Sequence, residues 1–318
     1  MRRMLFVSLL LAAGLAHAQD YPAKPIRMIV PYPPGGGTDV VARIVNEKLS
    51  LELGQSIVID NKGGAGGSVG TEIASKAAPD GYTILLTLSS HTINPKLFPK
   101  LGYDVERDFI PISLAASIPQ ILVANPSVPA SNMQELLAWM KANPGKGTFV
   151  DQNAAARVTG ILMQQSTGTK IEFIPYRGAG PAMQAMLGGQ VDLMVVQAAV
   201  TLPQARAGAV KILANLSPAR SRVIPDIPTS EESGIPGLYA SGWFGLFAPR
   251  ATPKEIVAKL NGAMMHALAD AKVQARFADL GLDVAPRGQQ TSEGLAAFHK
   301  GEIEKWWPII KAAGIKVE

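Results

Sequence analysis

Hydrophobic and polar positions in the first part of the chain follow two periods, one typical of buried strands and one typical of amphipathic helices. Short apolar runs predict strands at Ile26–Val30, Ser56–Ile59 and Tyr82–Leu88. Between them, apolar residues recur at helical spacing from Val40 to Leu53, where Gly54 ends the helix, and again over Val69–Ala77. Strands separated by helices and short loops indicate parallel β-α-β units, and therefore an α/β protein.

The pattern shifts after Asn125–Pro129. Ser131 with Gln134 predicts a capping box for a helix that ends near Lys141. Further strands are predicted at Thr148–Val150, Ile171–Ile174, Val191–Val196 and Lys211–Ala214, and the last part of the chain is predicted to be helical over Pro253–Ala269, Val273–Leu280 and Thr291–Ala313. We expect this helical tail to pack back onto the first lobe, which makes that lobe discontinuous.

The N-terminus has the pattern of a secretory signal peptide. Arg2 and Arg3 precede the apolar run Met4–Ala16, and the small residues Ala16 and Ala18 occupy positions −3 and −1 before a cleavage point after Ala18. An uncleaved membrane anchor is the alternative, but the run is shorter than the roughly 20 residues needed to span a bilayer. We therefore expect residues 1–18 to be removed and the protein to be exported to the periplasm.

Composition excludes several classes of protein. The sequence contains no cysteine, so disulfides, thiolate metal sites and cysteine nucleophiles are absent. Loss of Arg2 and Arg3 lowers the formal net charge from +5 to +3, and no cluster of lysine or arginine is left, so nucleic-acid binding is not expected. His91, His266 and His299 lack the spacing of metal ligands, so no metal is expected.

Two glycine-rich loops, Gly35–Gly37 and Gly63–Gly67, each follow a predicted strand and precede a predicted helix. Converging backbone N–H groups and a helix N-terminus together make an anion site without any lysine or arginine. The alternative is that the glycines only close tight turns. Neither loop continues as a nucleotide-binding motif, so no cofactor is expected.

Other candidates are single residues. Thr38 or Asp39 is expected to N-cap the helix after the first loop. His91 lies just past the third strand and is a candidate ligand contact, whereas His266 and His299 are expected to be partly exposed helix residues.

Gly66–Gly70 matches the G-x-S-x-G pattern of serine hydrolases, which makes a secreted hydrolase using Ser68 the alternative function. Residues 60–65 separate this pattern from the strand, however, and a nucleophile elbow turns directly off its strand.

Longer motifs follow one another across the whole mature chain. They are Tyr21–Asp39 (YPxKPIRxIVPYPPGGxxD), Gly64–Gly70, Pro79–Thr83, Asn94-Pro95, Pro175–Gly178, Leu187–Val191, Pro225–Thr229, Trp243–Pro249, Ala312–Ile315 and Glu318. With these motifs the sequence closely resembles the Bug-type periplasmic solute-binding receptors of the tripartite tricarboxylate transporter family.

The resemblance implies a two-lobed α/β fold of the periplasmic binding-protein type, type II-like, in which each lobe is a sheet flanked by helices. Lobe 1 is expected over residues 19–124 and 248–318, lobe 2 over 125–247, with the ligand cleft between them. It also implies a monomeric receptor without enzymatic activity, which passes a small organic anion to permease subunits in the membrane. A receptor that serves a membrane sensor is a further alternative.

The resemblance also implies which residues bind the ligand. They are Tyr32, Gly36, Gly37, Asp39, Gly66, Gly67, Ser89 and Ser90 in the first lobe, and Asp151, Asn153, Arg157, Tyr176, Arg177, Gly178 and Gly180 in the second. Where the family usually has a Gly/Ser-rich stretch, this chain has Phe149–Arg157. We hypothesise that Arg157 or Arg177 pairs with the distal group of an anionic ligand, the alternative being a surface arginine. The ligand itself stays open among di- and tricarboxylates, amino acids and aromatic acids.

Overall fold

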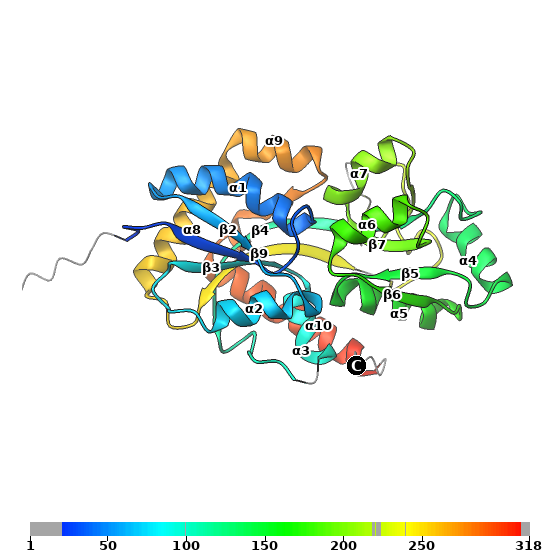
Figure 1. The fold of residues 1–318 in the computed structure, drawn as a ribbon, viewed down its shortest axis with the longest axis horizontal. Helices are drawn as coiled ribbons and strands as arrows, with labels where there is room; N and C mark the ends of the chain where they lie inside the picture. Colours follow the sequence, from blue (N-terminus) through cyan, green and yellow to red (C-terminus); the bar gives the residue numbers. More distant parts are fainter. Residues whose placement is uncertain (1–20, 99, 218–219, 221–223, 239, 313–318) are drawn as a thin grey trace, which may run out of the picture.

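Two lobes joined by long strands make up the computed structural model, which describes residues 21–98, 100–217, 220, 224–238 and 240–312 (Figure 1). The predicted signal peptide lies outside the described residues. Within them, no helix combines the length and the apolar character needed to cross a membrane.

Lobe 1 begins with the expected parallel β-α-β units. Strand β1 (Ile26–Val30) lies between β2 (Ile57–Asn61) and β3 (Thr83–Leu88) and is parallel to both. Helix α1 (Gly37–Leu53) follows β1, α2 (Ser68–Ser75) follows β2 through the short 3-10 turn Ala65–Gly67, and α3 (Ser90–Leu97) follows β3. Gly54 ends α1 in the left-handed conformation at φ 66°, as the sequence predicts.

Two antiparallel strands connect the lobes, β4 (Phe109–Ala124) and β9 (Ser241–Pro249). Strand β9 lies between β3 and β4. The first part of β4, Phe109–Pro119, pairs with β9, and the rest, Gln120–Ala124, pairs with β7 and β8 of the second lobe. In Figure 1 both strands run across the centre of the molecule. The expected lobe boundaries stay predictions. Both fall in the strands that cross between the lobes, residue 124 at the end of β4 and residue 248 inside β9.

Lobe 2 repeats the alternation of strands and helices. Its elements are α4 (Met133–Ala142), β5 (Thr148–Asp151), α5 (Ala154–Thr167), β6 (Glu172–Pro175), α6 (Ala179–Leu187), β7 (Leu193–Gln197), α7 (Ala198–Arg206) and β8 (Lys211–Asn215). The predicted capping box is wrong by one residue. Asn132 caps α4 by accepting the N–H of Glu135, and the Glu135 carboxylate accepts the N–H of Ser131. The first bond is that of a capping box, whereas the Glu135 carboxylate binds the N–H of the residue before the N-cap instead of the N-cap N–H.

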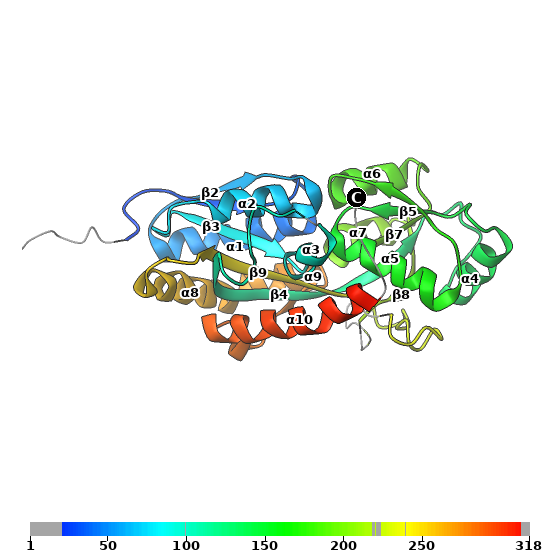
Figure 2. The same cartoon turned by 90° about the horizontal axis from the view of Figure 1, so that it is seen from below.

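The helical tail packs against lobe 1, as expected. Helix α8 (Lys254–Ala269) contacts α1 and β4, α9 (Ala271–Asp279) contacts α1, and α10 (Ser292–Ala312) contacts β4 and α3. The two-residue strand β10 (Asp283–Val284) pairs with β4, and a 3-10 turn spans Arg287–Gln289. Figure 2 shows α10 along one face of the connecting strands.

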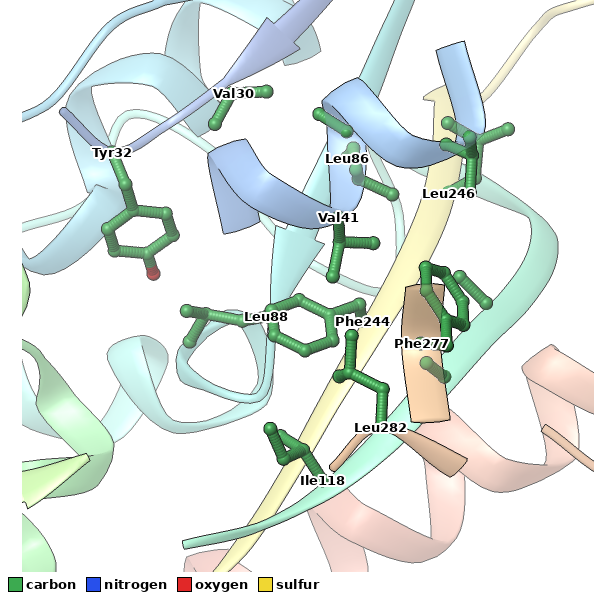
Figure 3. Packing of buried hydrophobic residues seen from close by; sticks show 14 of the residues in the cluster. Val30, Tyr32, Val41, Leu86, Leu88, Ile118, Phe244, Leu246, Phe277 and Leu282 are labelled. Carbon is green, nitrogen blue, oxygen red and sulfur yellow. The ribbon is translucent and has the colours of Figure 1, made fainter. Parts of the chain in front are cut away.

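The main hydrophobic cluster fixes the ends of the lobe 1 strands. Val30 of β1, Leu88 of β3, Phe244 of β9, Val41 of α1 and Phe277 of α9 meet in it (Figure 3), and all five are at most 4% exposed. Burial of such side chains stabilises the fold by roughly 1.5–3 kcal/mol each. The loops that leave β1 and β3 therefore start from rigid positions.

Candidate ligand-binding site

A pocket of about 400 Å³ lies between the lobes, where the carboxyl ends of β1 and β2 face those of β5 and β6. This volume is within the usual range for small-molecule sites. Its lining residues come from both lobes: Tyr32, Gly64, Ala65, Gly66, Gly67 and Phe98 from lobe 1, and Asp151, Gln152, Asn153, Arg157, Pro175, Tyr176 and Arg177 from lobe 2. The pocket thus brings together eight of the predicted site residues: Tyr32, Gly66, Gly67, Asp151, Asn153, Arg157, Tyr176 and Arg177.

The lobe 1 wall of the pocket is a tight turn of backbone. Ala65, Gly66 and Gly67 have φ values of 46°, 62° and 97°. The hydroxyl of Tyr32 donates to the Gly66 carbonyl at 3.1 Å, and a Cβ on Gly67 would lie 2.5 Å from that hydroxyl. The position therefore needs glycine for its conformation and for its space. Gly67 is also the N-cap of α2, so the turn presents a helix N-terminus to the pocket.

Asp39 stabilises the neighbouring glycine loop from behind and does not line the pocket. Helix α1 begins at Gly37 with Gly36 as its N-cap, so the expectation that Thr38 or Asp39 caps it is wrong. The Asp39 carboxylate accepts the Gly35 N–H at 2.9 Å, Arg43 Nε at 2.9 Å and Asn61 Nδ2 at 3.1 Å.

Asp39 is ionised in this setting. Burial favours the neutral acid and opposes ionisation, but the hydrogen bonds from Arg43, from the Gly35 N–H and from Asn61 outweigh it, so the pKa of Asp39 is lowered. Asp39 thus contributes to the shape of the loop that contains Gly36 and Gly37, both buried and outside the pocket lining.

Ser89, Ser90 and His91 follow β3 and are not among the residues that line the pocket. All three are at most 1% exposed. The His91 ring lies 5.1 Å from Phe109 and 5.3 Å from His299, measured between ring centroids, and neither of its nitrogens has a hydrogen-bond partner among the described residues.

Burial, together with His299, keeps the pKa of His91 well below its usual value. His299 is 5% exposed, so the expectation that it is partly exposed is wrong, and burial lowers its pKa to about 4. The side chain of His266, by contrast, is 70% exposed.

The lobe 2 wall presents charged side chains. Asp151 is the last residue of β5, and Asn153 caps α5 by accepting the Ala156 N–H at 2.9 Å. Arg157 Nη1 lies 3.1 Å from Asp151 Oδ2, and its guanidinium carbon lies 4.3 Å from the centroid of the Phe173 ring. Burial raises the pKa of Asp151 even though Arg157 lowers it.

The loop after β6 contacts lobe 1. The Tyr176 N–H donates to the Asp151 carbonyl at 2.9 Å, whereas Arg177 is exposed and has no side-chain partner in the part of the chain that the structure describes. A Cβ on Gly178 would lie 2.8 Å from Pro33 Cδ, and one on Gly180 would lie 3.4 Å from the Pro34 carbonyl oxygen. Gly178 and Gly180 therefore allow close contact between the lobes at the edge of the pocket.

The lobes also touch through side chains on helices. Ile93 and Leu97 of α3 pack with Ala155 and Val158 of α5 and with Trp306 of α10 in one buried cluster. The two lobes are thus in contact beside the pocket and between α3 and α5, and the pocket lies between them.

Five lining residues were missed by the sequence analysis: Gly64, Ala65, Phe98, Gln152 and Pro175. Gly64 and Ala65 belong to the predicted glycine loop, and Gln152 lies between two predicted residues, so the strand-end pattern could have found them. Pro175 is the last residue of β6 and could have been found in the same way. Phe98 follows α3, and no local signal places it here.

Ser68 has no catalytic base beside it. Its hydroxyl is 3.0 Å from Asn94 Nδ2 and 3.4 Å from the Tyr103 hydroxyl, and no histidine is hydrogen-bonded to it within the described ranges. The hydrolase alternative therefore lacks the geometry it requires.

Two other kinds of site were considered on the described part of the chain, a metal site and a second hollow. It holds no group of three or more acidic or histidine residues that could bind a metal. A second hollow of about 480 Å³ lies between α1 and α9, away from the strand ends. Two of its basic residues are already paired, Arg43 with Asp39 and Lys48 with Glu52.

Comparison with known proteins identifies the family. Residues 41–315 match the profile described as "Tripartite tricarboxylate transporter family receptor". Protein BugT of Bordetella pertussis (strain Tohama I) is 37% identical over 318 residues, covering 99% of this chain and 97% of BugT. The solved structure of periplasmic binding protein BugD matches with a TM-score of 0.90 and 38% identity, covering 93% of this chain and 100% of BugD.

A ligand-bound structure is also similar. MatC from Rhodopseudomonas palustris with bound malate matches with a TM-score of 0.88 and 34% identity, covering 91% of this chain and 100% of MatC. These similarities confirm the resemblance seen in the motifs and the two-lobed α/β binding-protein fold. The chain belongs to the tripartite tricarboxylate transporter receptor family, whose Bug-type members are periplasmic solute-binding proteins.

Proposed function

We propose that this chain is exported to the periplasm, captures a small carboxylate-bearing solute between its lobes, and delivers it to the membrane permease of a tripartite tricarboxylate-type transporter. The observation that carries the proposal is the pocket itself, which lies at strand ends and is closed by residues of both lobes. A ligand that touches both walls stabilises the closed arrangement, and this differential affinity is what couples binding to lobe closure.

The chemistry of the pocket favours an anion. Gly67 and Asn153, the N-caps of α2 and α5, both line it, and helix N-termini stabilise negative charge. Arg157 and Arg177 add positive charge, against which Asp151 is the single acidic side chain among the lining residues. The malate bound to the related MatC supports a carboxylate as the class of ligand.

The residues we propose as direct ligand contacts are the eight predicted residues that line the pocket. The other predicted residues, Gly36, Gly37, Asp39, Ser89, Ser90, Gly178 and Gly180, are proposed to shape the loops and the contact between the lobes. Three further parts of the proposal have other support: the N-terminal sequence pattern supports a signal peptide cleaved after Ala18, and the family resemblance supports a periplasmic monomer and permease subunits as the partner that receives the solute.

A thermal-shift screen over mono-, di- and tricarboxylates, aromatic acids and amino acids tests the binding function. A ligand at 100 times its dissociation constant adds about 2.7 kcal/mol of stability, which corresponds to a rise in Tm of about 5 °C. Small-angle scattering with the ligand that gives the largest shift is expected to show compaction, and mass spectrometry is expected to recover that ligand unchanged. Conversion of the ligand to a product, or the absence of a shift for every acid, would contradict the proposal.

A further inference from the structure

We propose that Asn94 is a positioning residue of the binding site, and that it couples binding at the glycine turn of lobe 1 to the contact between the lobes. Asn94 lies on helix α3 and holds the turn, while neighbouring side chains of the same helix pack against lobe 2. This inference rests on the proposed receptor function and goes beyond it, because it assigns a role in binding to residues that do not line the pocket.

The first observation is the hydrogen bonding of Asn94. Its side-chain nitrogen donates to the Gly66 carbonyl at 3.3 Å and to the Ser68 hydroxyl at 3.0 Å, and the residue is 1% exposed. Gly66 belongs to the turn that lines the pocket, and Ser68 is the first residue of α2. Asn94 itself is not among the lining residues. It therefore fixes the turn and the start of α2 relative to α3 without contacting the solute.

The second observation is the apolar contact between α3 and lobe 2. Ile93 and Leu97 of α3 are each 1% exposed, and they pack with Ala155 and Val158 of α5, which are at most 7% exposed. None of these four side chains lines the pocket. Burial of apolar surface between two lobes stabilises the arrangement in which they touch. The α3–α5 contact thus favours closure of the lobes without contacting the solute.

Helix α5 has the corresponding double role in lobe 2. Asn153, its N-cap, and Arg157 line the pocket, whereas Ala155 and Val158 of the same two turns pack against α3. A solute that touches both the glycine turn and the start of α5 therefore joins the same elements that Asn94 and the apolar contact join. Each interaction favours the arrangement that the other requires, which is a positive coupling free energy between them.

Helix α3 is held firmly in lobe 1, as this coupling requires. The indole N–H of Trp307 in α10 donates to the Thr92 carbonyl at 2.8 Å, and Lys96 Nζ lies 4.0 Å from the centroid of the same indole. Trp306, also in α10, is 2% exposed and belongs to the α3–α5 cluster. Because α10 fixes α3 from behind, a shift of the lobe contact reaches the glycine turn through Asn94.

A matched pair of valine variants tests the lobe contact. V158A and V128A each shorten a valine that is at most 2% exposed, but Val128 lies in the hydrophobic cluster within lobe 2. We expect V158A to raise the radius of gyration of the ligand-free mature protein in small-angle scattering, and V128A to leave it unchanged. V158N places a neutral polar group in the same contact and is expected to raise it further. Circular dichroism checks that each variant is folded.

Binding is measured by calorimetry with the tightest binder among malate, adipate, citrate, L-aspartate and benzoate. V158N is expected to weaken this binding about tenfold, because an unpaired amide buried in the closed arrangement disfavours it by about that factor. Every other acid that binds is expected to lose affinity by the same factor, since the apparent dissociation constant depends on the closed fraction of the protein. V128A is expected to bind as the wild type does.

A double-mutant cycle tests the positioning role of Asn94. N94A is expected to weaken binding about tenfold. In the N94A background we expect V158N to weaken binding by less than about threefold, because closure no longer aligns the turn with the solute. N46A is the matched control, since Asn46 of α1 also donates to a backbone carbonyl, that of Ile57 at 3.2 Å, but lies outside the pocket lining. In the N46A background the full tenfold effect of V158N is expected.

The outcomes separate the coupling from the receptor function. Scattering and binding of V158N equal to those of the wild type, or a tenfold effect of V158N that persists in N94A, overturns the coupling and leaves the receptor function in place. If circular dichroism shows V158N to be unfolded, V158A replaces it in the cycle, with the same criterion of non-additivity. Failure of every acid to bind overturns the receptor function, and the ligand-free scattering then still decides whether the α3–α5 contact holds the lobes together.

Discussion

The two walls of the pocket bind by different means. On the lobe 1 side, the wall is largely the backbone of the turn Gly64–Gly67, and the Tyr32 hydroxyl donates a hydrogen bond to the Gly66 carbonyl of that turn. On the lobe 2 side, the wall is largely side chains, with Asp151, Gln152, Arg157 and Arg177 at the ends of β5 and β6. Almost every residue offers the same backbone N–H donor, whereas the charge and the hydrogen-bonding groups of a side chain depend on the residue type.

This difference separates two tasks. A backbone wall at a helix N-terminus binds a carboxylate of any parent molecule, because it makes hydrogen bonds with the anionic group alone. A side-chain wall distinguishes one parent molecule from another, because its charges and donors match only some ligands. We therefore expect changes in lobe 1 to affect stability and all binding, and changes in lobe 2 to affect which solute binds.

The largest expected effect is that of G67A on the backbone wall. The added Cβ would lie 2.5 Å from the Tyr32 hydroxyl, at a residue with φ 97°. Strain and overlap together are expected to lower the free energy of unfolding by about 3 kcal/mol and to abolish binding of every acid. Urea denaturation and calorimetry measure the two effects.

G35A is the matched control for G67A. Gly35 has φ 82°, but an added Cβ would have no atom within 4 Å. This variant includes the backbone strain without the overlap, so we expect a loss of about 1 kcal/mol and retained binding. Equal losses in the two variants would show that the close approach of Tyr32 to Gly67 is unimportant for the wall.

A smaller effect is expected from D39N, which weakens the network behind the first glycine loop. Asn keeps the shape of the side chain but loses the charge-assisted bonds from Gly35 and Arg43 and places a donor against Asn61. We expect a loss of about 2 kcal/mol, because bonds to a buried charged group contribute roughly that much. The affinities for the different acids are expected to fall by the same factor, because the change does not alter the side chains that distinguish one acid from another.

The pH dependence of the D39N effect gives a second check. The pKa of Asp39 is lowered from its ordinary value of 3.8, so the unfolded chain binds the proton more readily than the folded one. The stabilisation by Asp39 is therefore complete above pH 3.8 and is lost as the pH falls through the lowered folded value. The difference between wild type and D39N is expected to shrink in that range, and a difference that stays constant to pH 2 would argue against an ionic role.

The contrast between the walls also explains how much of the site could be predicted. Glycine loops at strand ends are local features, so Gly66 and Gly67 could be placed from the sequence alone. Gly178 and Gly180 have the same pattern but lie against Pro33 and Pro34 at the contact between the lobes. Nothing local distinguishes a glycine that faces a ligand from one that faces the other lobe.

Some parts of the fold could not be predicted from local sequence patterns either, because they depend on contacts between residues that are distant in the sequence. The strand β1 and the end of α1 at Gly54 follow from apolar spacing and a left-handed glycine. The strand β4, which crosses between the lobes, is long and mostly buried. Its residues do not alternate between buried and exposed, so the period of two that marks a half-buried strand is absent. The burial of His299 depends on its packing against Phe247 and Trp243, which are distant in sequence.

The smallest expected effect, and the sharpest test of the side-chain wall, is R177A. Arg177 is exposed and has no partner within the described residues, so its removal is expected to change the free energy of unfolding by less than about 0.5 kcal/mol. Binding of the acid that gives the largest thermal shift is expected to weaken about threefold at low salt and less at 0.5 M salt, because an exposed charge contributes modestly and is screened. R206A removes an exposed arginine of the same lobe that lies outside the pocket and is expected to bind as the wild type does. Equal affinities for R177A and R206A at low salt would leave Asp151 and Arg157 as the charged side chains through which the lobe 2 wall selects its ligand.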